Sequence, residues 1–121
     1  MDFFCLTPGG IRAGYASPRL LRALRPRLRA RYRGRVVFIS TASPFYSLRG
    51  VRPGASLAAA RRVLRLSRPF RVGLNDWYVA PYGRVRAVLK VRHGKVEEIG
   101  IAEKALTKNR RIGLRFFKSF L

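Results

Sequence analysis

The feature that most constrains the fold is a strand–turn–strand pattern between Val85 and Ala102. In its first half, hydrophobic residues alternate with mostly basic ones, and this period of two is typical of a strand with one buried face. His93-Gly94 then supplies a two-residue turn of the kind that joins antiparallel strands, and the chain returns as a second strand. The pattern predicts an α+β fold, in which short helices pack on one side of an antiparallel sheet.

A Gly-rich turn leads into a short amphipathic helix between Tyr46 and Leu66 (YSLRGVRPGASLAAARRVLRL). Ser56 stands where an N-cap belongs, because its hydroxyl can accept a hydrogen bond from an amide of the first turn. At about 3.6 residues per turn, one face of the helix is apolar and the opposite face is basic. The apolar residues are Leu57, Ala60 and Leu64, with Val63 beside them, and the basic residues are Arg61, Arg62 and Arg65. We therefore expect this helix to lie on the sheet with its arginines in solvent.

Further elements are indicated on both sides of this helix. Ser17 and Pro18 begin a short helix that Pro26 ends, and Thr107 is the expected cap of a last helix. The expected strands are Phe3–Leu6 and Ile11–Tyr15, which form a hairpin around Thr7–Gly10, then Val36–Ile39, Phe70–Val72 and Trp77–Ala80. The last helix gathers Ile112, Phe116, Phe117 and Phe120 on one side. This stripe predicts a core face, and the alternative is a basic amphipathic helix on a membrane surface.

The length of 121 residues and the hydrophobic fraction of 48% fit one domain, residues 1–121. A weak echo, offset by forty residues, matches IRAGYASPRLLRAL from Ile11 with VRPGASLAAARRVL from Val51. Two interpretations stay open. One is a tandem repeat with halves 1–45 and 46–105, followed by a C-terminal helix over 107–121. The other is chance identity in an arginine-rich chain.

The formal net charge is +22, from 27 Lys and Arg residues against 5 Asp and Glu residues, and arginine outnumbers lysine. Charge of this size indicates an anionic partner, such as nucleic acid, acidic lipid or an acidic envelope polymer. The alternative is compositional, because a GC-rich genome encodes arginine freely and the surface then merely carries it. The sequence does not separate these two explanations.

Arginine occupies every odd position from Arg25 to Arg35. A period of two is typical of a strand, and it would set successive arginines about 6.6 Å apart along one face. Such a row could follow an anionic backbone, and the alternative is a solvent-exposed edge strand or loop whose charges prevent edge-to-edge pairing. The candidate polyanion-binding residues are Arg27, Arg29, Arg31, Arg33 and Arg35.

The sequence offers little to an enzyme. The acidic residues are Asp2, Asp76, Glu97, Glu98 and Glu103. Glu97 and Glu98 are adjacent in a strand and so point to opposite faces, while His93, the single histidine, is explained by its tight turn. No phosphate-binding loop, metal-ligand spacing or nucleophile motif is present, and Cys5 is alone. We expect a non-enzymatic protein without catalytic residues, metal or cofactor.

No stretch of the sequence reaches the roughly 18 apolar residues of a membrane span. The first residues, MDFFCLTP, have an acidic start and lack the apolar core of a signal peptide. A chain that is complete as given would be cytoplasmic. A chain that belongs to a longer exported product would act outside the cell or at the cell envelope.

Three segments carry a family resemblance: the turn and capped helix GVRPGASLAAARRVL, the aromatic strand NDWYVAP and the hairpin VLKVRHGKVEEIGI. Together they resemble the β-lactamase-inhibitor-protein-like fold, shared with small outer-membrane assembly lipoproteins. The chain is also similar to uncharacterised terminal modules of secreted bacterial proteins from GC-rich genomes. Most of the similarity lies between Tyr46 and Ala102. No lipidation signal is present, and the charge is far more basic than the resemblance leads one to expect.

The resemblance implies a non-catalytic module of a secreted or envelope-associated bacterial protein, which binds a protein or an anionic surface polymer through its sheet. By the same analogy, the candidate partner contacts are Tyr46, Trp77, Tyr78 and Tyr82. The alternative for each of these aromatic residues is burial, and Trp77 fits the core better. The alternative function is nucleic-acid binding through contacts between arginines and phosphates, without sequence-specific readout.

Overall fold

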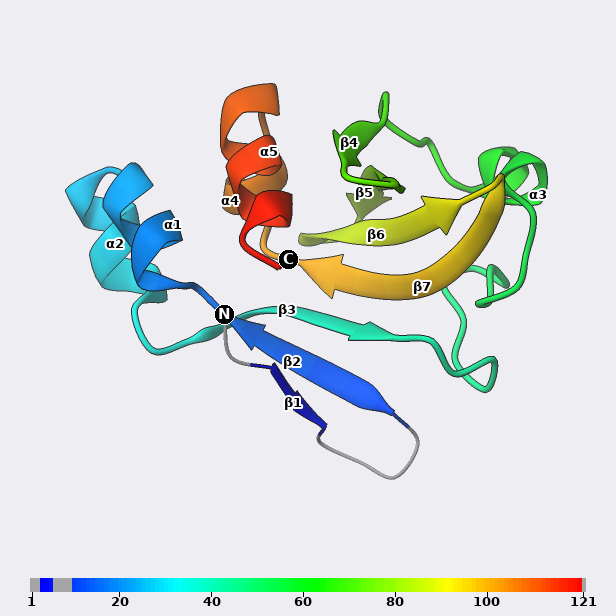
Figure 1. Ribbon diagram of the computed structural model, residues 1–121, viewed down its shortest axis with the longest axis horizontal. Helices are drawn as coiled ribbons and strands as arrows, with labels where there is room; N and C mark the ends of the chain where they lie inside the picture. The colour runs from blue at the N-terminus through cyan, green and yellow to red at the C-terminus, as the bar shows by residue number, and fades with distance from the viewer. Residues whose placement is uncertain (1–2, 6–9, 121) are drawn as a thin grey trace.

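A computed structural model describes residues 3–5 and 10–120 of the chain, with side chains described from residue 10 onward. The strands are β1 (Phe3–Cys5), β2 (Ile11–Tyr15), β3 (Val36–Thr41), β4 (Phe70–Val72), β5 (Asn75–Tyr82), β6 (Val85–Arg92) and β7 (Lys95–Ala102). The helices are α1 (Pro18–Ala23), α2 (Pro26–Tyr32), α3 (Leu57–Val63), α4 (Lys104–Thr107) and α5 (Arg110–Lys118). The strands form one antiparallel sheet in the order β1-β2-β3-β7-β6-β5-β4, which confirms the α+β class (Figure 1).

The β6–β7 hairpin forms as the sequence predicts. Val91 lies opposite Val96, and Leu89 lies opposite Ile99. His93 and Gly94 have φ values of 52° and 73°, the pair of positive angles that a tight two-residue hairpin turn requires. The pairing of β1 with β2 is also antiparallel, as expected, although Thr7–Gly9 of its turn and the side chain of Cys5 lie outside the described residues.

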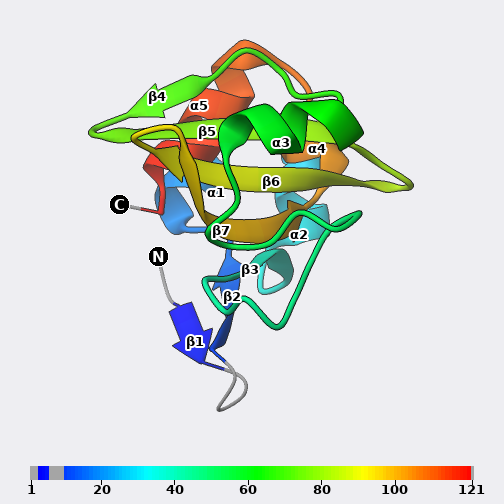
Figure 2. The same ribbon diagram turned by 90° about the vertical axis from the view of Figure 1, so that its right-hand side faces the viewer.

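Helices lie against both faces of the sheet, rather than on the one side that the sequence predicted. The helices α1, α2, α4 and α5 share a hydrophobic cluster with Val79 and Val88, whereas α3 packs on the opposite face with Leu89. Figure 2 shows α3 in front of β6, with α1 and α5 behind the sheet. The two faces follow from the alternation along β6, because Val88 and Leu89 are adjacent and point in opposite directions.

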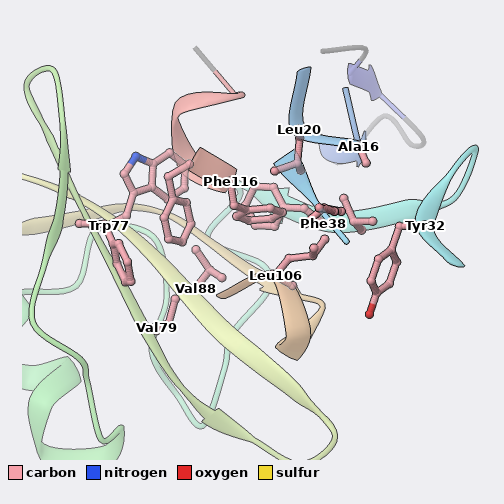
Figure 3. Packing of buried hydrophobic residues seen from close by; sticks show 14 of the residues in the cluster. Ala16, Leu20, Tyr32, Phe38, Trp77, Val79, Val88, Leu106 and Phe116 are labelled. Carbon is pink, nitrogen blue, oxygen red and sulfur yellow. The ribbon is translucent and has the colours of Figure 1, made fainter. Parts of the chain in front are cut away.

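The larger cluster is built on aromatic rings (Figure 3). Phe38 of β3 meets Phe116 of α5 edge to face, with 5.8 Å between ring centroids, and Trp77 of β5 stacks on Phe117 at 4.9 Å. Phe116 and Phe117 are 0% and 1% exposed. The apolar stripe of the last helix is therefore a core face, as predicted. Its cap differs from the prediction: the Asn109 side chain, rather than that of Thr107, accepts a hydrogen bond from the amide of Ile112.

The helix α3 confirms its predicted cap and its buried face. The amide of Ala59 donates to the Ser56 hydroxyl at 3.0 Å. Leu64 is 2% exposed and clusters with Leu89 and Val91, while Val63 beside it is exposed. Arg61, Arg62 and Arg65 are exposed, as expected.

The arginine-rich segment is a helix, so the prediction of an edge strand or loop is wrong. Pro26 does not simply end the first helix; it occupies the first position of α2, where its fixed φ and missing N–H suit a helix start. Leu28 and Tyr32 are one helical turn apart and both pack on the core. Their period of four, rather than the period of two of the arginines, determines the local structure.

The forty-residue offset between the two similar segments aligns α1 with α3 and β3 with β5 in the sequence. The segment 11–15 is a strand, whereas its counterpart 51–55 is irregular with an isolated bridge at Val51. The tandem repeat stays a prediction.

Candidate anion-binding surface

The helices α1 and α2 lie at one end of the molecule, at the left of Figure 1, and both carry exposed arginines. Every charged residue from Phe3 to Asn75 is an arginine, so no carboxylate of this part of the chain can offset them. We call the exposed arginines of α2 and the turn that follows it the α2 arginine surface. It consists of Arg27, Arg31, Arg33 and Arg35.

Arg29, the fifth predicted polyanion contact, is used within the protein. Its guanidinium donates to the carbonyl of Leu21 through Nε at 3.0 Å and to that of Leu24 through an η nitrogen at 3.0 Å. These carbonyls lie at the C-terminal end of α1, where the amide of Leu24 donates to Leu21 and no further helical turn supplies donors. Arg29 therefore caps α1 and ties it to α2.

Helical geometry also changes the predicted spacing of the arginines. Residues two apart on a helix point in directions about 200° apart, so the regular row of the strand prediction does not exist. Arg27 and Arg31 instead share one face, being one turn apart, and the Arg31 guanidinium lies 5.5 Å from the ring centroid of Tyr32. Arg33 and Arg35 follow the end of the helix. The result is a cationic patch rather than a linear track.

The four aromatic candidates for partner contact separate into two groups. Trp77 and Tyr78 are 7% and 4% exposed and belong to the two hydrophobic clusters, on opposite faces of the sheet. Tyr46 is 39% exposed, and Tyr82 is partly exposed with the Arg49 guanidinium 5.1 Å from its ring centroid. Only Tyr46 and Tyr82 reach the surface on which a partner could lie.

The carboxylates of the described residues are engaged by neighbouring groups. Glu98, 8% exposed, accepts from the Arg12 guanidinium and from the Lys90 ammonium, the latter at 3.0 Å. Asp76 pairs with Arg71 at 3.4 Å. Burial lowers the pKa of Lys90 below its ordinary value, in spite of the nearby charge of Glu97.

Glu103 lies beside the buried phenol of Tyr32. Burial raises the pKa of Tyr32, and the charge of Glu103 and a hydrogen bond to it raise that pKa further. Within the part of the chain that the structure describes, no three His, Cys, Asp or Glu side chains gather as a metal site would require.

An apolar groove on the α3 side of the sheet was not predicted. Two adjoining hollows, each of about 170 Å³, share Ile39 of β3 and Ile101 of β7 in their linings. The alternation of Ile99 and Ile101 in the sequence was the available signal, but it does not indicate which face of the sheet other elements cover.

No protein-family model matches the chain, and no curated protein matches it in sequence. Among solved structures, the chain is similar to an extracellular protein containing an SCP domain from Bacillus anthracis str. Ames. The TM-score is 0.54 at 11% sequence identity, and the similarity covers 90% of this chain but 37% of the other. At this identity the likeness shows the fold alone. Among the described residues, no helix is long and apolar enough to cross a membrane.

Proposed function

We propose that this chain is a non-enzymatic binding module of a secreted or envelope-associated bacterial protein, which recognises a protein or an anionic surface polymer. The observation that carries the proposal is the α2 arginine surface, whose guanidinium groups face solvent without a carboxylate nearby in the sequence. Charge of one sign that is concentrated on a surface repels itself in the folded protein and attracts polyanions over about a Debye length.

Two further observations support the proposal. The carboxylates of β5 and β7 are engaged in ion pairs, so they are poorly placed for the proton transfers of acid–base catalysis. A bacterial extracellular protein shares the fold over most of this chain, which is consistent with a module that acts outside the cell.

Nucleic-acid binding is the second candidate, because the same guanidinium groups can pair with the phosphates of a nucleic acid. Arg27 and Arg31 lie one turn apart on one helix face, a spacing of about 6 Å, close to the separation of successive phosphates along one strand. Contacts of this kind give affinity without sequence readout.

The test compares the binding of the purified protein to three probes over a range of salt concentrations. The probes are a phosphodiester-linked envelope polymer, a short duplex DNA of mixed sequence and a neutral polysaccharide. The variant is Arg27→Ala/Arg31→Ala, and its matched control is Arg62→Ala/Arg65→Ala, which removes the same charge near α3. On DNA, we expect the first pair to flatten the slope of log K against log salt by roughly two units and the control to change it little.

The three probes separate the two candidates. Tighter binding to the envelope polymer than to DNA at equal salt supports the first candidate, and the reverse supports the second. Equal losses in the two double variants would show that the charge acts without a localised site, and this result would overturn both.

A further inference from the structure

We propose that the apolar groove along β3 and β7 docks an extended peptide segment in which hydrophobic and acidic residues alternate. The floor of the groove is the pair Ile39 and Ile101, which lie directly opposite each other in the sheet. Both are only partly buried, and both line each of the two hollows. The two hollows therefore adjoin at this pair.

The groove follows the direction of β3. One hollow is lined by residues from Ile39 to Thr41, and the other by residues from Val36 to Ile39. Six residues of a strand extend about 20 Å, so the groove has the length of an extended segment of similar size. An elongated apolar floor of this kind suits alternate side chains of a strand-like peptide.

One wall of the groove is formed by the segment after β3, which passes in front of the sheet in Figure 2. Tyr46 and Leu48 line the hollow nearest this segment, and Phe45 beside them is 88% exposed. The segment is held in place by the amide of Ser43, which donates to Thr41 Oγ1 at 3.0 Å, and by Leu48 and Val51, whose backbones exchange hydrogen bonds of 2.9 Å. The wall is thus formed before any partner binds.

The other end of the groove is open and apolar. Val36 is 40% exposed, and Val85 lines the same hollow from β6. Glu103 is the one carboxylate in the lining of the two hollows, and its charge also acts on the Tyr32 phenol, whose pKa it raises.

Charge determines the chemistry of the partner. Arg49 lies over the Tyr82 ring, and Arg52 donates to the carbonyl of Pro44 at 2.9 Å, so both lie near the Tyr46 wall. Arg35 and Arg84 immediately precede Val36 and Val85 at the open end. A peptide segment that places apolar side chains on the floor and carboxylates toward these arginines is complementary to both the apolar floor and the basic rim of the groove. A second copy of this chain would instead bring another charge of +22 to the same place.

The groove lies on the α3 side of the sheet, because Ile101 shares its face with Ile99 of the α3 cluster. The helix α2 packs on the other side. The groove is therefore separate from Arg27 and Arg31, which can be tested independently of it, whereas Arg35 borders both the groove and the α2 arginine surface.

The experiment titrates the isotope-labelled protein with three synthetic peptides of equal length and follows backbone amide shifts by NMR. One peptide alternates leucine with glutamate, the second alternates leucine with glutamine, and the third alternates serine with glutamate. We expect the first peptide to bind about tenfold or more tightly than either of the others and to shift the amides of Ile39, Leu48 and Ile101.

Exposed residues supply variants that leave the fold intact. Phe45→Ala and Tyr46→Ala should each weaken binding of the leucine–glutamate peptide, whereas Leu74→Ala, at a side chain 72% exposed in the β4–β5 turn, should not. Equal binding of the serine–glutamate peptide would overturn the proposal, because charge alone would then suffice. Shifts confined to α1 and α2, or concentration-dependent shifts of the same groove amides without peptide, which would indicate self-association, would also overturn it.

Discussion

Arg29 caps the end of α1 by donating to the carbonyl of Leu24 at 3.0 Å. Among the five arginines that the sequence proposes for polyanion contact, this one therefore has a structural role. Substitution of Arg29 should therefore affect stability, whereas substitution of its neighbour Arg27 should affect polyanion binding.

We expect Arg29→Ala to lower the free energy of unfolding by about 1–2 kcal/mol, because carbonyls of α1 lose a charged donor. Arg27→Ala, at an exposed position, should change stability by less than about 0.5 kcal/mol. On duplex DNA, Arg27→Ala should flatten the salt slope by roughly 0.9, and Arg29→Ala should leave it unchanged. Urea unfolding and salt titrations of both variants measure these quantities. A stable Arg29→Ala protein with a flattened slope would contradict the assigned role.

The helix α3 allows a ranking of three substitutions. Leu64→Ala should cost about 2–5 kcal/mol, because it leaves a cavity beside Leu89. Ser56→Ala should cost about 1 kcal/mol through the lost cap to the Ala59 amide. Arg62→Ala, in solvent, should stay within about 0.5 kcal/mol of the unchanged protein. Thermal unfolding of the three variants gives the order, and a largest loss for Arg62→Ala would contradict the orientation of the helix.

The parts of the fold that could be predicted depend on signals close together in the sequence. The β6–β7 hairpin needs only an alternating pattern and the His93-Gly94 turn. The cap of α3 needs only Ser56 and the apolar positions that follow it. Trp77 also lies in the core, in agreement with the alternative that this aromatic residue is buried rather than a partner contact.

The parts that could not be predicted depend on competing periods or on distant segments. The six arginines at alternate positions from Arg25 to Arg35 suggest a strand, but charged residues tolerate either geometry in solvent. The pair Leu28 and Tyr32, which packs on the core, therefore determines the helix α2. The role of Arg29 depends on how α1 and α2 pack, and the groove depends on β3 and β7, which are far apart in the chain. No local pattern contains that information.

Gly113 lowers the helix propensity of α5, but its neighbours leave no room for a larger residue. A Cβ at this position would lie 2.7 Å from Cε1 of Phe70. Phe70 has little room to move, because its ring packs on Phe117 at 5.2 Å and Arg110 lies 4.0 Å from its centroid. Gly113→Ala gains up to about 1 kcal/mol in helix propensity but overpacks the core by about 1–3 kcal/mol. We expect net destabilisation by chemical unfolding.

A double-mutant cycle checks the cause of this loss. In a Phe70→Leu background, the smaller side chain gives the new methyl group space, so Gly113→Ala should cost less or become stabilising. The same penalty in both backgrounds would show that Phe70 is not the obstacle.

Tyr32 should give the protein a dependence on alkaline pH. Its pKa in the folded state is raised above 10.0, first by burial and then by Glu103. The phenol of the unfolded chain therefore loses its proton at lower pH than that of the folded chain. The contribution of Tyr32 to the free energy of unfolding is complete below about pH 10 and decreases as the pH rises through the raised pKa.

We expect Tyr32→Phe to make stability decline less steeply above this pH, as measured by urea unfolding at a series of pH values. Lys90, whose lowered pKa makes stability rise with pH in the alkaline range, is present in both proteins and cancels in the comparison. Glu103→Gln should lower the pKa of Tyr32, followed by the ultraviolet absorbance of tyrosinate, yet leave it above its ordinary value, because burial is the largest cause. A return to the ordinary pKa in Glu103→Gln would assign the whole effect to the carboxylate and would contradict the role of burial.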